Sequence, residues 1–362
     1  MRNTYLTLTA AVAIAAAVGL AQQAGPYKVL NKAKAGGLGG FDYIYADAVG
    51  RRLYIPRSGD NNATPPVPAR VSVFDLDSLA AVGEIPDVRA AGAAVDAESG
   101  HGFASSKPVT MWDTKTLKVI KTINVDGGPD GILADAYNHR VYIFSHQAPH
   151  VTVIDAKSGD VLGTLDLGGA PEQAATDGAG HLYVDVSDKA NVAVIDTKAM
   201  TVTGHYPLGD NINGVAGLAL DAKNHILFAA CRGASPTMVI LSATDGKIIT
   251  TLPLAGSTDG AVFNPATMEA FSSHGNGTMT IVKENSPTSF VVEQNLDTMM
   301  GAKTLTLDSK TSHVLTMAAE YGAPPAPAAA PPAGASGGQG RGRGPARGPM
   351  LAGSFTILVV GK

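Results

Sequence analysis

The sequence predicts an all-β protein: a seven-bladed β-propeller of four-stranded antiparallel blades, closed by an N-terminal strand that completes the last blade. Three observations predict this fold. A turn residue recurs at intervals of 39 to 49 residues, short β-rich runs fill each interval, and the N-terminal part of the chain supplies the strand that the last interval lacks. Repeats of about this length with four strands each are typical of propeller blades.

The recurring turn residue is an Asp or Asn that follows a short strand. A β-rich run comes after each turn, such as Arg140-Val-Tyr-Ile-Phe, and a second run often ends in Asp, such as Val151-Thr-Val-Ile-Asp155. A polar turn then leads to a further run, for example Lys247-Ile-Ile-Thr-Thr-Leu. With the strand before the turn, each unit has four strands. The seven turn residues are Asp47, Asp96, Asp135, Asp177, Asp221, Asn264 and Asp308.

Closure of the ring is predicted independently. The last unit ends at Phe355-Thr-Ile-Leu-Val-Val, which leaves no residues for a fourth strand. Near the N-terminus, Tyr27-Lys-Val-Leu-Asn-Lys resembles Leu117-Lys-Val-Ile-Lys-Thr, which stands at the fourth-strand position of the second blade. We therefore expect the N-terminal run to complete the last blade, because this pairing leaves no open sheet edge.

The repeats also resemble those of a known family. The run Arg140-Val-Tyr-Ile-Phe-Ser and the residues 151–165 look like the YVTN repeat of YncE-like β-propellers, and the likeness extends over the mature chain. Blades five and six depart from the pattern, since Ser242 and Lys283 replace the Asp that ends the run. The resemblance implies a seven-bladed extracytoplasmic propeller. It implies little about activity, because members of the family are mostly uncharacterised.

Composition limits the classes of function. The chain has 362 residues, a formal net charge of −4 and one cysteine, Cys231. Neutralising phosphates needs a basic surface, so we expect no nucleic-acid partner. One thiol excludes a disulfide framework and a Cys-based zinc site, and Cys231 is expected to be a small core or loop residue. The single Trp112 is expected to pack between blades, and no haem, nucleotide or catalytic signature occurs.

Residues 1–21 have the pattern of a secretory signal peptide. Arg2 precedes an apolar run from Leu6 to Leu20, and small residues lead to a cleavage point after Ala21. We expect the mature chain, residues 22–362, to be a single propeller domain in the periplasm or the medium. No later stretch has the roughly 18 continuous apolar residues of a membrane span.

Residues 322–350 interrupt the last blade with Pro, Ala, Gly and Arg. This composition cannot bury enough apolar surface to offset its ordering entropy, so we expect a disordered insertion between the second and third strands. The loop should lie on the face of the channel mouth. There Arg341, Arg343 and Arg347 would either fold back onto acidic residues or move freely as a tolerated insertion.

One repeat position predicts a site at the mouth of the central channel. If the strands run antiparallel from the axis outward, the residue five positions before each turn residue lies near this mouth. Four of the seven residues are acidic and one is a lysine, which apolar packing does not require. They are Asp42, Ala91, Asp130, Glu172, Ala216, Asp259 and Lys303.

Two interpretations of these acids stay open. Carboxylates between low-dielectric walls attract a cation or a polar ligand, and oxygen ligands suit calcium, magnesium or manganese. Asp130, Glu172 and Asp259 are the candidate metal ligands. Alternatively, the acids accept backbone N–H groups of the glycine-rich turns at 127–129 and 168–171, or face water in a wide channel.

Two histidines, His146 and His274, follow a serine at the end of a second strand, on the channel-mouth face. Their blades lie across the ring, so only a bridging ligand would contact both. Exposed surface loops are the simpler expectation for them.

The sequence therefore favours a monomeric, extracytoplasmic binding scaffold without catalytic residues, which presents its channel mouth to a small polar ligand, a peptide or a protein. The alternative is a divalent-metal-dependent hydrolase, such as a lactonase, whose ion polarises a carbonyl group or activates water at the acidic ring. The predicted ligand-binding residues are Asp42, Asp130, Glu172, Asp259, Lys303, His146 and His274.

Overall fold

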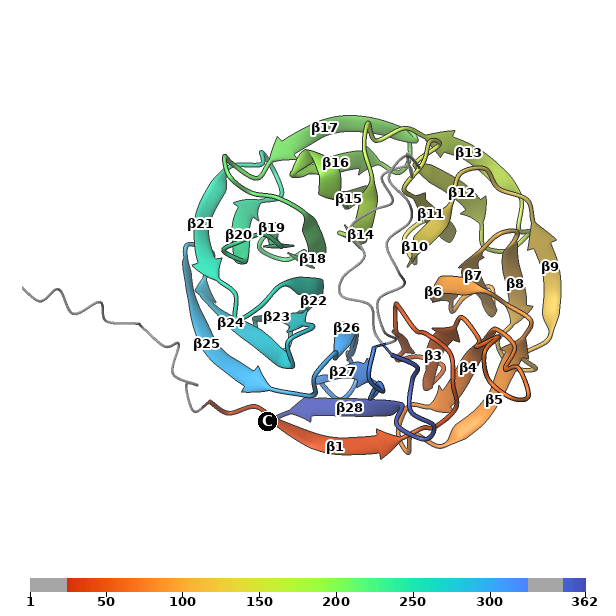
Figure 1. Ribbon diagram of the computed structural model, residues 1–362. Coiled ribbons are helices and arrows are strands. Elements are labelled where there is room, and N and C mark those ends of the chain that lie inside the picture. Colours follow the sequence, from red (N-terminus) through yellow and green to blue (C-terminus); the bar gives the residue numbers. More distant parts are fainter. Residues whose placement is uncertain (1–24, 325–347) are drawn as a thin grey trace, which may run out of the picture.

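Seven four-stranded sheets form a ring in the computed structural model of the chain, which describes residues 25–324 and 348–362 (Figure 1). In six sheets the strands follow one another in sequence order from the channel outward. The predicted seven-bladed propeller is confirmed. Among the described residues the one helix is the short 3-10 turn η1 (Ser187–Lys189), and none forms a helix long and apolar enough to cross a membrane.

The strands of the first four blades are β2 (Tyr45–Asp47), β3 (Arg52–Arg57), β4 (Arg70–Asp75) and β5 (Ala81–Pro86); β6 (Ala90–Asp96), β7 (His101–Ser106), β8 (Val109–Asp113) and β9 (Val119–Ile123); β10 (Pro129–Asp135), β11 (Arg140–Ser145), β12 (Val151–Asp155) and β13 (Val161–Leu165); and β14 (Pro171–Thr176), β15 (His181–Val186), β16 (Asn191–Asp196) and β17 (Thr201–Pro207). Those of the last three are β18 (Val215–Asp221), β19 (Ile226–Cys231), β20 (Thr237–Ser242) and β21 (Ile248–Pro253); β22 (Thr258–Asn264), β23 (Glu269–His274), β24 (Thr278–Ser286) and β25 (Ser289–Asp297); and β26 (Lys303–Asp308), β27 (His313–Ala318), β28 (Thr356–Gly361) and β1 (Lys28–Lys34).

The N-terminal strand closes the ring, as predicted. β1 pairs antiparallel with β28, for example at Lys32 and Leu358, and so becomes the outer strand of blade seven. Tyr27, just before β1, is buried against Phe271 of blade six, and its hydroxyl donates a hydrogen bond to Glu269. Closure therefore joins both ends of the described chain to one blade and also ties the N-terminal strand to its neighbour.

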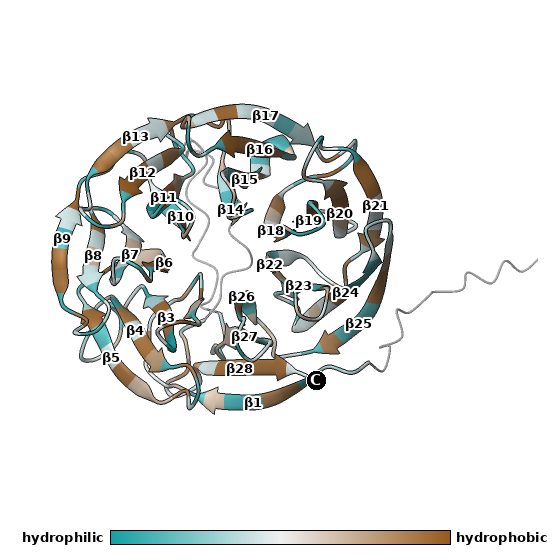
Figure 2. Cartoon of the chain, turned by 180° about the vertical axis from the view of Figure 1, so that it is seen from behind, coloured by the Kyte–Doolittle hydropathy of each residue, from teal (hydrophilic) through white to brown (hydrophobic). Residues whose placement is uncertain are grey.

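The core consists of buried apolar clusters at each of the seven interfaces between adjacent blades. Figure 2 shows hydrophobic stretches on many of the strands, and all six residues of β19 are buried. Trp112 packs between blades one and two, where its ring lies 5.7 Å from that of Tyr54. Cys231 is buried in the cluster between blades four and five. Both side chains therefore have the packing roles that the sequence predicted.

The seven recurring Asp and Asn residues build the hairpins between the first and second strands. Each side chain accepts a backbone N–H from the turn that follows, as in the 2.8 Å bond from Gly50 to Asp47. A side-chain oxygen at this position satisfies a turn N–H that no strand partner reaches. The Asp and Asn residues recur because each hairpin turn needs a side-chain acceptor for its backbone N–H. These turns lie on the face opposite the channel mouth.

Two predicted segments fall largely outside the described residues: the signal peptide at 1–21, and residues 325–347 of the insertion at 322–350, with Arg341, Arg343 and Arg347. The described ends of the insertion pair with each other, since the Gly322 N–H donates to the Pro349 carbonyl at 2.8 Å. The insertion therefore leaves and re-enters blade seven between β27 and β28, where the sequence placed it.

Because Tyr27 fastens the closing strand, Tyr27→Ala should destabilise the protein by about 3–5 kcal/mol, the usual cost of removing a large buried aromatic side chain. Tyr27 is 3% exposed, whereas Leu30 in the same strand is 38% exposed. The matched control Leu30→Ala should therefore cost no more than about 0.5 kcal/mol. Urea unfolding of residues 22–362 measures both, and equal losses would contradict this role of Tyr27.

Candidate functional site

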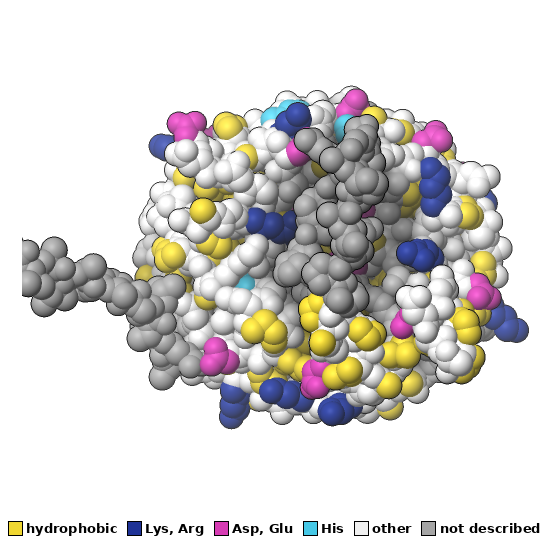
Figure 3. Space-filling view, in the orientation of Figure 1, with side chains coloured by type: hydrophobic (Ala, Val, Ile, Leu, Met, Phe, Trp, Pro, Cys, Tyr) yellow, Lys and Arg dark blue, Asp and Glu magenta, His cyan; other side chains and the backbone are white. Residues whose placement is uncertain are grey.

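A polar cavity of about 290 Å³ lies at the channel mouth, where the inner strands of the ring converge. Figure 3 shows this face, with acidic and basic side chains around its centre. The cavity is lined by Asp42, Tyr43, Asp130, His146, Glu172, Ala216, Arg232, Asp259, Lys303 and Thr304.

The repeat position five residues before each turn residue does converge here. Six of its seven members line the cavity, and the seventh, Ala91, lines a neighbouring groove together with Asp42. In six blades the register of the two innermost strands shifts at this position. Such bulges change the direction of a side chain and commonly stand beside functional sites.

In blade four a buried carboxylate supports the bulge. Asp185 of β15 is fully buried, and its Oδ1 accepts the backbone N–H groups of Glu172 at 3.1 Å and of Gln173 at 2.6 Å. Burial raises the pKa of Asp185 to about 7. Asp185 therefore fixes the backbone that carries Glu172 into the cavity.

One side of the cavity is a chain of alternating charges. Lys303 lies 2.9 Å from Asp42 and 3.4 Å from Asp259, and the other oxygen of Asp259 lies 2.6 Å from Arg232. Burial alone would lower the pKa of Lys303, but the two carboxylates raise it above its usual value. Asp42 and Asp259 thus already have cationic partners within the protein.

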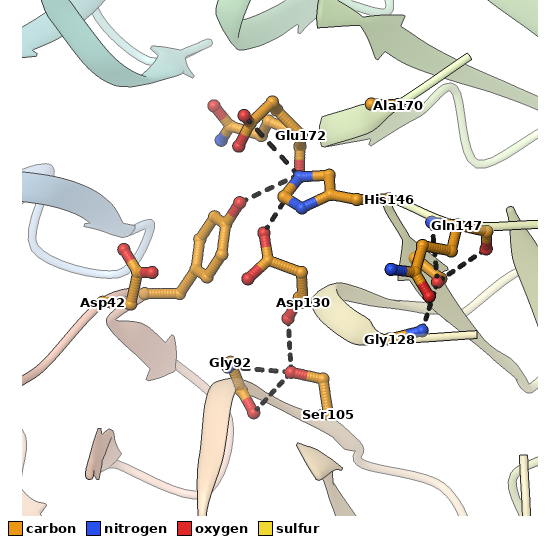
Figure 4. Close-up of polar contacts among 12 residues, drawn as sticks. Asp42, Gly92, Ser105, Gly128, Asp130, His146, Gln147, Ala170 and Glu172 are labelled. Atoms are coloured by element: carbon orange, nitrogen blue, oxygen red, sulfur yellow. Dashed lines mark hydrogen bonds and ion pairs between the residues drawn. The ribbon is translucent and has the colours of Figure 1, made fainter. Parts of the chain in front are cut away.

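The other side brings a histidine between two carboxylates (Figure 4). His146 Nε2 lies 3.4 Å from Asp130 Oδ2 and 3.6 Å from Glu172 Oε1. Burial raises the pKa of Asp130 to about 6. Arg232 reaches toward this side as well, but its nearest nitrogen is 4.0 Å from Glu172.

Two side chains span the channel beneath these charges. The Tyr43 hydroxyl of blade one donates to the Glu172 carbonyl of blade four at 3.0 Å. Gln173 of blade four donates to the Ala261 carbonyl of blade six and accepts the N–H groups of Leu218 and Ala261. The first bond joins blades on opposite sides of the ring and the others join blades four, five and six, so these side chains narrow the channel beneath the mouth.

The glycine-rich turns do not use the ring acids as N–H acceptors. Within the described residues, Gly128 donates to Ser145, Gly168 to Asp166, and Ala170 to Asp188. The acids of the ring are therefore not needed to satisfy these turns, and their carboxylates face the cavity.

The expectation that His146 and His274 lie in exposed loops is wrong. The His146 side chain is only 16% exposed and lines the cavity. His274 is fully buried at the end of β23, away from the cavity lining, and its Nε2 contacts the Thr280 hydroxyl at 3.0 Å. His146 is the residue after β11, whereas His274 is the last residue of β23. Successive side chains along a strand point to opposite sides, so this offset of one position directs one histidine to the axis and buries the other.

Sequence reasoning missed Arg232, Tyr43 and Asp185. A signal for Arg232 was present, because it follows the second strand of blade five just as His146 follows that of blade three. Tyr43 precedes the short strand β2, and Asp185 sits inside an apolar strand, so neither position carried a repeat signal.

Comparison with known proteins supports the fold. No family model matches the chain, and no curated protein matches it significantly. A chain of the solved structure entitled "Crystal Structure of Mitotic Checkpoint Complex" has 13% identity and a TM-score of 0.64, covering 87% of this chain and 95% of that chain. A chain of Kuenenia stuttgartiensis hydrazine synthase has 15% identity and a TM-score of 0.65, with 77% and 92% covered.

The comparisons show a β-propeller. At these identities the likeness concerns the fold alone, because propellers carry many unrelated functions. Membership of the YncE-like family stays a prediction from the repeats.

His274 should make stability depend on pH. Burial lowers its pKa to about 4 from an ordinary value of 6.5, so the unfolded state binds the proton more tightly. Above about pH 6.5 the imidazole is neutral in both states and the free energy of unfolding is at its full value. As the pH falls toward 4, the unfolded state takes up the proton first, and the free energy of unfolding decreases by up to about 3 kcal/mol. Urea unfolding at pH 7 and pH 4.5 should show a smaller loss for His274→Asn than for the unaltered protein.

The control for this prediction is His225→Asn. His225 is exposed and has a positive φ of 54°, which Asn tolerates. This variant should keep the full pH dependence. The same pH dependence in His274→Asn and in the unaltered protein would contradict the effect assigned to burial.

Proposed function

We propose that this protein is an exported, non-catalytic binding propeller whose channel mouth takes a small polar ligand with a positively charged amine. The observation that carries the proposal is the charge of the cavity lining. Four carboxylates, Asp42, Asp130, Glu172 and Asp259, face two fixed cations, Arg232 and Lys303, and four minus two leaves a formal surplus of two negative charges.

The location strengthens the attraction for a cation. Fields from charges in a concave, partly dehydrated site are focused by its low-dielectric walls. The side chains of Asp130 and Glu172 are each only 22% exposed, and burial raises the pKa of Asp130. An entering amine would replace the missing solvent with charge-assisted hydrogen bonds.

The surroundings leave room for more than a free small molecule. A groove of about 540 Å³ over blades one to three shares Asp42 with the cavity, and one of about 460 Å³ over blades four and five shares Glu172 and Arg232. The same chemistry would therefore accept a lysine side chain whose peptide lies in these grooves.

The hydrolase alternative is not proposed, because no observation on the described residues favours it over binding.

Titration calorimetry tests the binding site. The probes are 1,4-diaminobutane, the tripeptide Gly-Lys-Gly, and succinate as an anion of similar size. The two amines should bind and succinate should not. Asp259→Asn should weaken amine binding at least tenfold, about 1.4 kcal/mol, because Arg232 and Lys303 lose a shared partner and oppose the amine.

The control variant is Asp160→Asn, an exposed acid on the outer part of blade three that pairs with Lys121. It should leave amine binding unchanged. Binding of succinate with an affinity equal to that of the amines, or an unaltered affinity in Asp259→Asn, would contradict the proposed cation site.

Export is tested separately. If residues 1–21 are a signal peptide, expression of the full chain in a Gram-negative host should give a periplasmic protein that begins at Gln22. Intact-mass measurement of the periplasmic fraction reports the cleavage. Recovery of the uncleaved chain from the cytoplasm would contradict export.

A further inference from the structure

The cavity holds a set of three side-chain donors on the side away from the alternating charge chain. Asp130 comes from β10, His146 from the residue after β11, and Glu172 from β14. One oxygen of each carboxylate and a ring nitrogen of the histidine all lie within 4.8 Å of one another. Two blades thus bring one nitrogen and two oxygens to a common point.

The distances match ligands around a metal better than direct hydrogen bonds. Nε2 lies 3.4 Å from Asp130 and 3.6 Å from Glu172, beyond the usual 2.7–3.2 Å of a hydrogen bond. With metal–ligand bonds of about 2.1 Å, two donors in a tetrahedral site lie about 3.4 Å apart. The existing positions therefore leave space for an ion between the three atoms.

The other two carboxylates of the cavity already have partners and are not needed as metal ligands. Asp259 is shared by Arg232 and Lys303, and Asp42 pairs with Lys303. The set predicted from the sequence, Asp130, Glu172 and Asp259, is thus changed: Asp259 neutralises two cations, and His146 takes its place beside the other two acids.

The three donors are held by contacts outside the cluster. The Ser145 hydroxyl accepts the Gly128 N–H at 2.6 Å and donates to the Gln147 carbonyl at 2.8 Å, so the chain is fixed on both sides of His146 (Figure 4). The Ser105 hydroxyl donates to the Asp130 carbonyl, and Asp185 holds the backbone of Glu172. Donors on rigid, supported strands lose little entropy on binding an ion.

We propose that Asp130, His146 and Glu172 bind a divalent transition-metal ion of the zinc type, with a further coordination position open to the cavity. An imidazole nitrogen with two carboxylates favours Zn²⁺, Co²⁺ or Ni²⁺ over calcium and magnesium, which take oxygen ligands. The inference goes beyond the proposed function, because it assigns a different cation to one side of the same mouth. A divalent ion would neutralise the surplus of two negative charges, so the ion and a protonated amine would be alternative cations here. The open coordination position would take a neutral or anionic donor.

Metal binding is tested on residues 22–362 after removal of metals with a chelator. Calorimetric titration with ZnCl₂ should give one equivalent per chain, while MgCl₂ and CaCl₂ give no saturable binding. With CoCl₂, visible absorption should show a d–d band of a site with fewer than six ligands. His146→Ala should weaken zinc binding at least about 100-fold and remove the cobalt band, since it deletes a direct ligand.

The matched control is His181→Ala, which removes an exposed histidine paired with Asp177 on the opposite face. It should keep one equivalent of zinc and the cobalt band. Unfolding curves of the metal-free His146→Ala variant and of His146→Asn show whether each is folded, so that loss of binding is not loss of structure.

Failure of this inference differs from failure of the proposed function. If the amines bind and zinc does not, the metal assignment is wrong and the cavity remains an amine site. If zinc binds with an affinity that His146→Ala and His146→Asn leave unchanged, the assignment is also overturned. Zinc binding that depends on His146 supports the metal site whether or not the amines bind.

Discussion

Backbone pairing between β1 and β28 is the constraint on which the rest of the structure depends. No single blade contains the channel mouth, because its charged residues come from blades one, three, four, five, six and seven. They meet only when the ring is closed, and β1 closes it by covering the edge of β28. Tyr27 and its contacts with Glu269 and Phe271 therefore act on the site although they lie at the outside of the ring.

Closure of the ring brings the charged side chains together at the channel mouth. Ion pairs between neighbouring side chains then neutralise the acids on one side of the mouth but not those on the other. Lys303 and Arg232 neutralise Asp42 and Asp259 along one side, at distances of 2.6 to 3.4 Å. Asp130 and Glu172 instead flank an imidazole whose ring lies between them. This division explains how a mouth with four acids remains folded, since like charges without partners would repel one another. It also leaves one side of the mouth with donors suited to an external cation.

The sequence predicted the fold and most of the cavity because both follow from a repeat. Each Asp or Asn turn residue has a local role, and the position five residues earlier has an equivalent place in every blade, so Asp130, Glu172 and Asp259 could be placed without coordinates. The pairing among them could not, because ion pairs across blades depend on side-chain reach and not on spacing. His146 and His274 show the limit most clearly: both follow a serine, but an offset of one position relative to the end of the strand places one in the cavity and the other in the core. Asp185 could not be predicted, because it lies inside an apolar strand at a position where the other blades have no acidic residue.

The most direct test of this account is the anomalous scattering of crystals grown with zinc, recorded on both sides of the zinc absorption edge. The account predicts one strong peak at the channel mouth, about 2.0–2.2 Å from Asp130 Oδ2, His146 Nε2 and Glu172 Oε1, with Asp259 still paired to Arg232 and Lys303. A peak between Asp42 and Asp259, or peaks only at surface carboxylates and histidines, would contradict the division of charges described above.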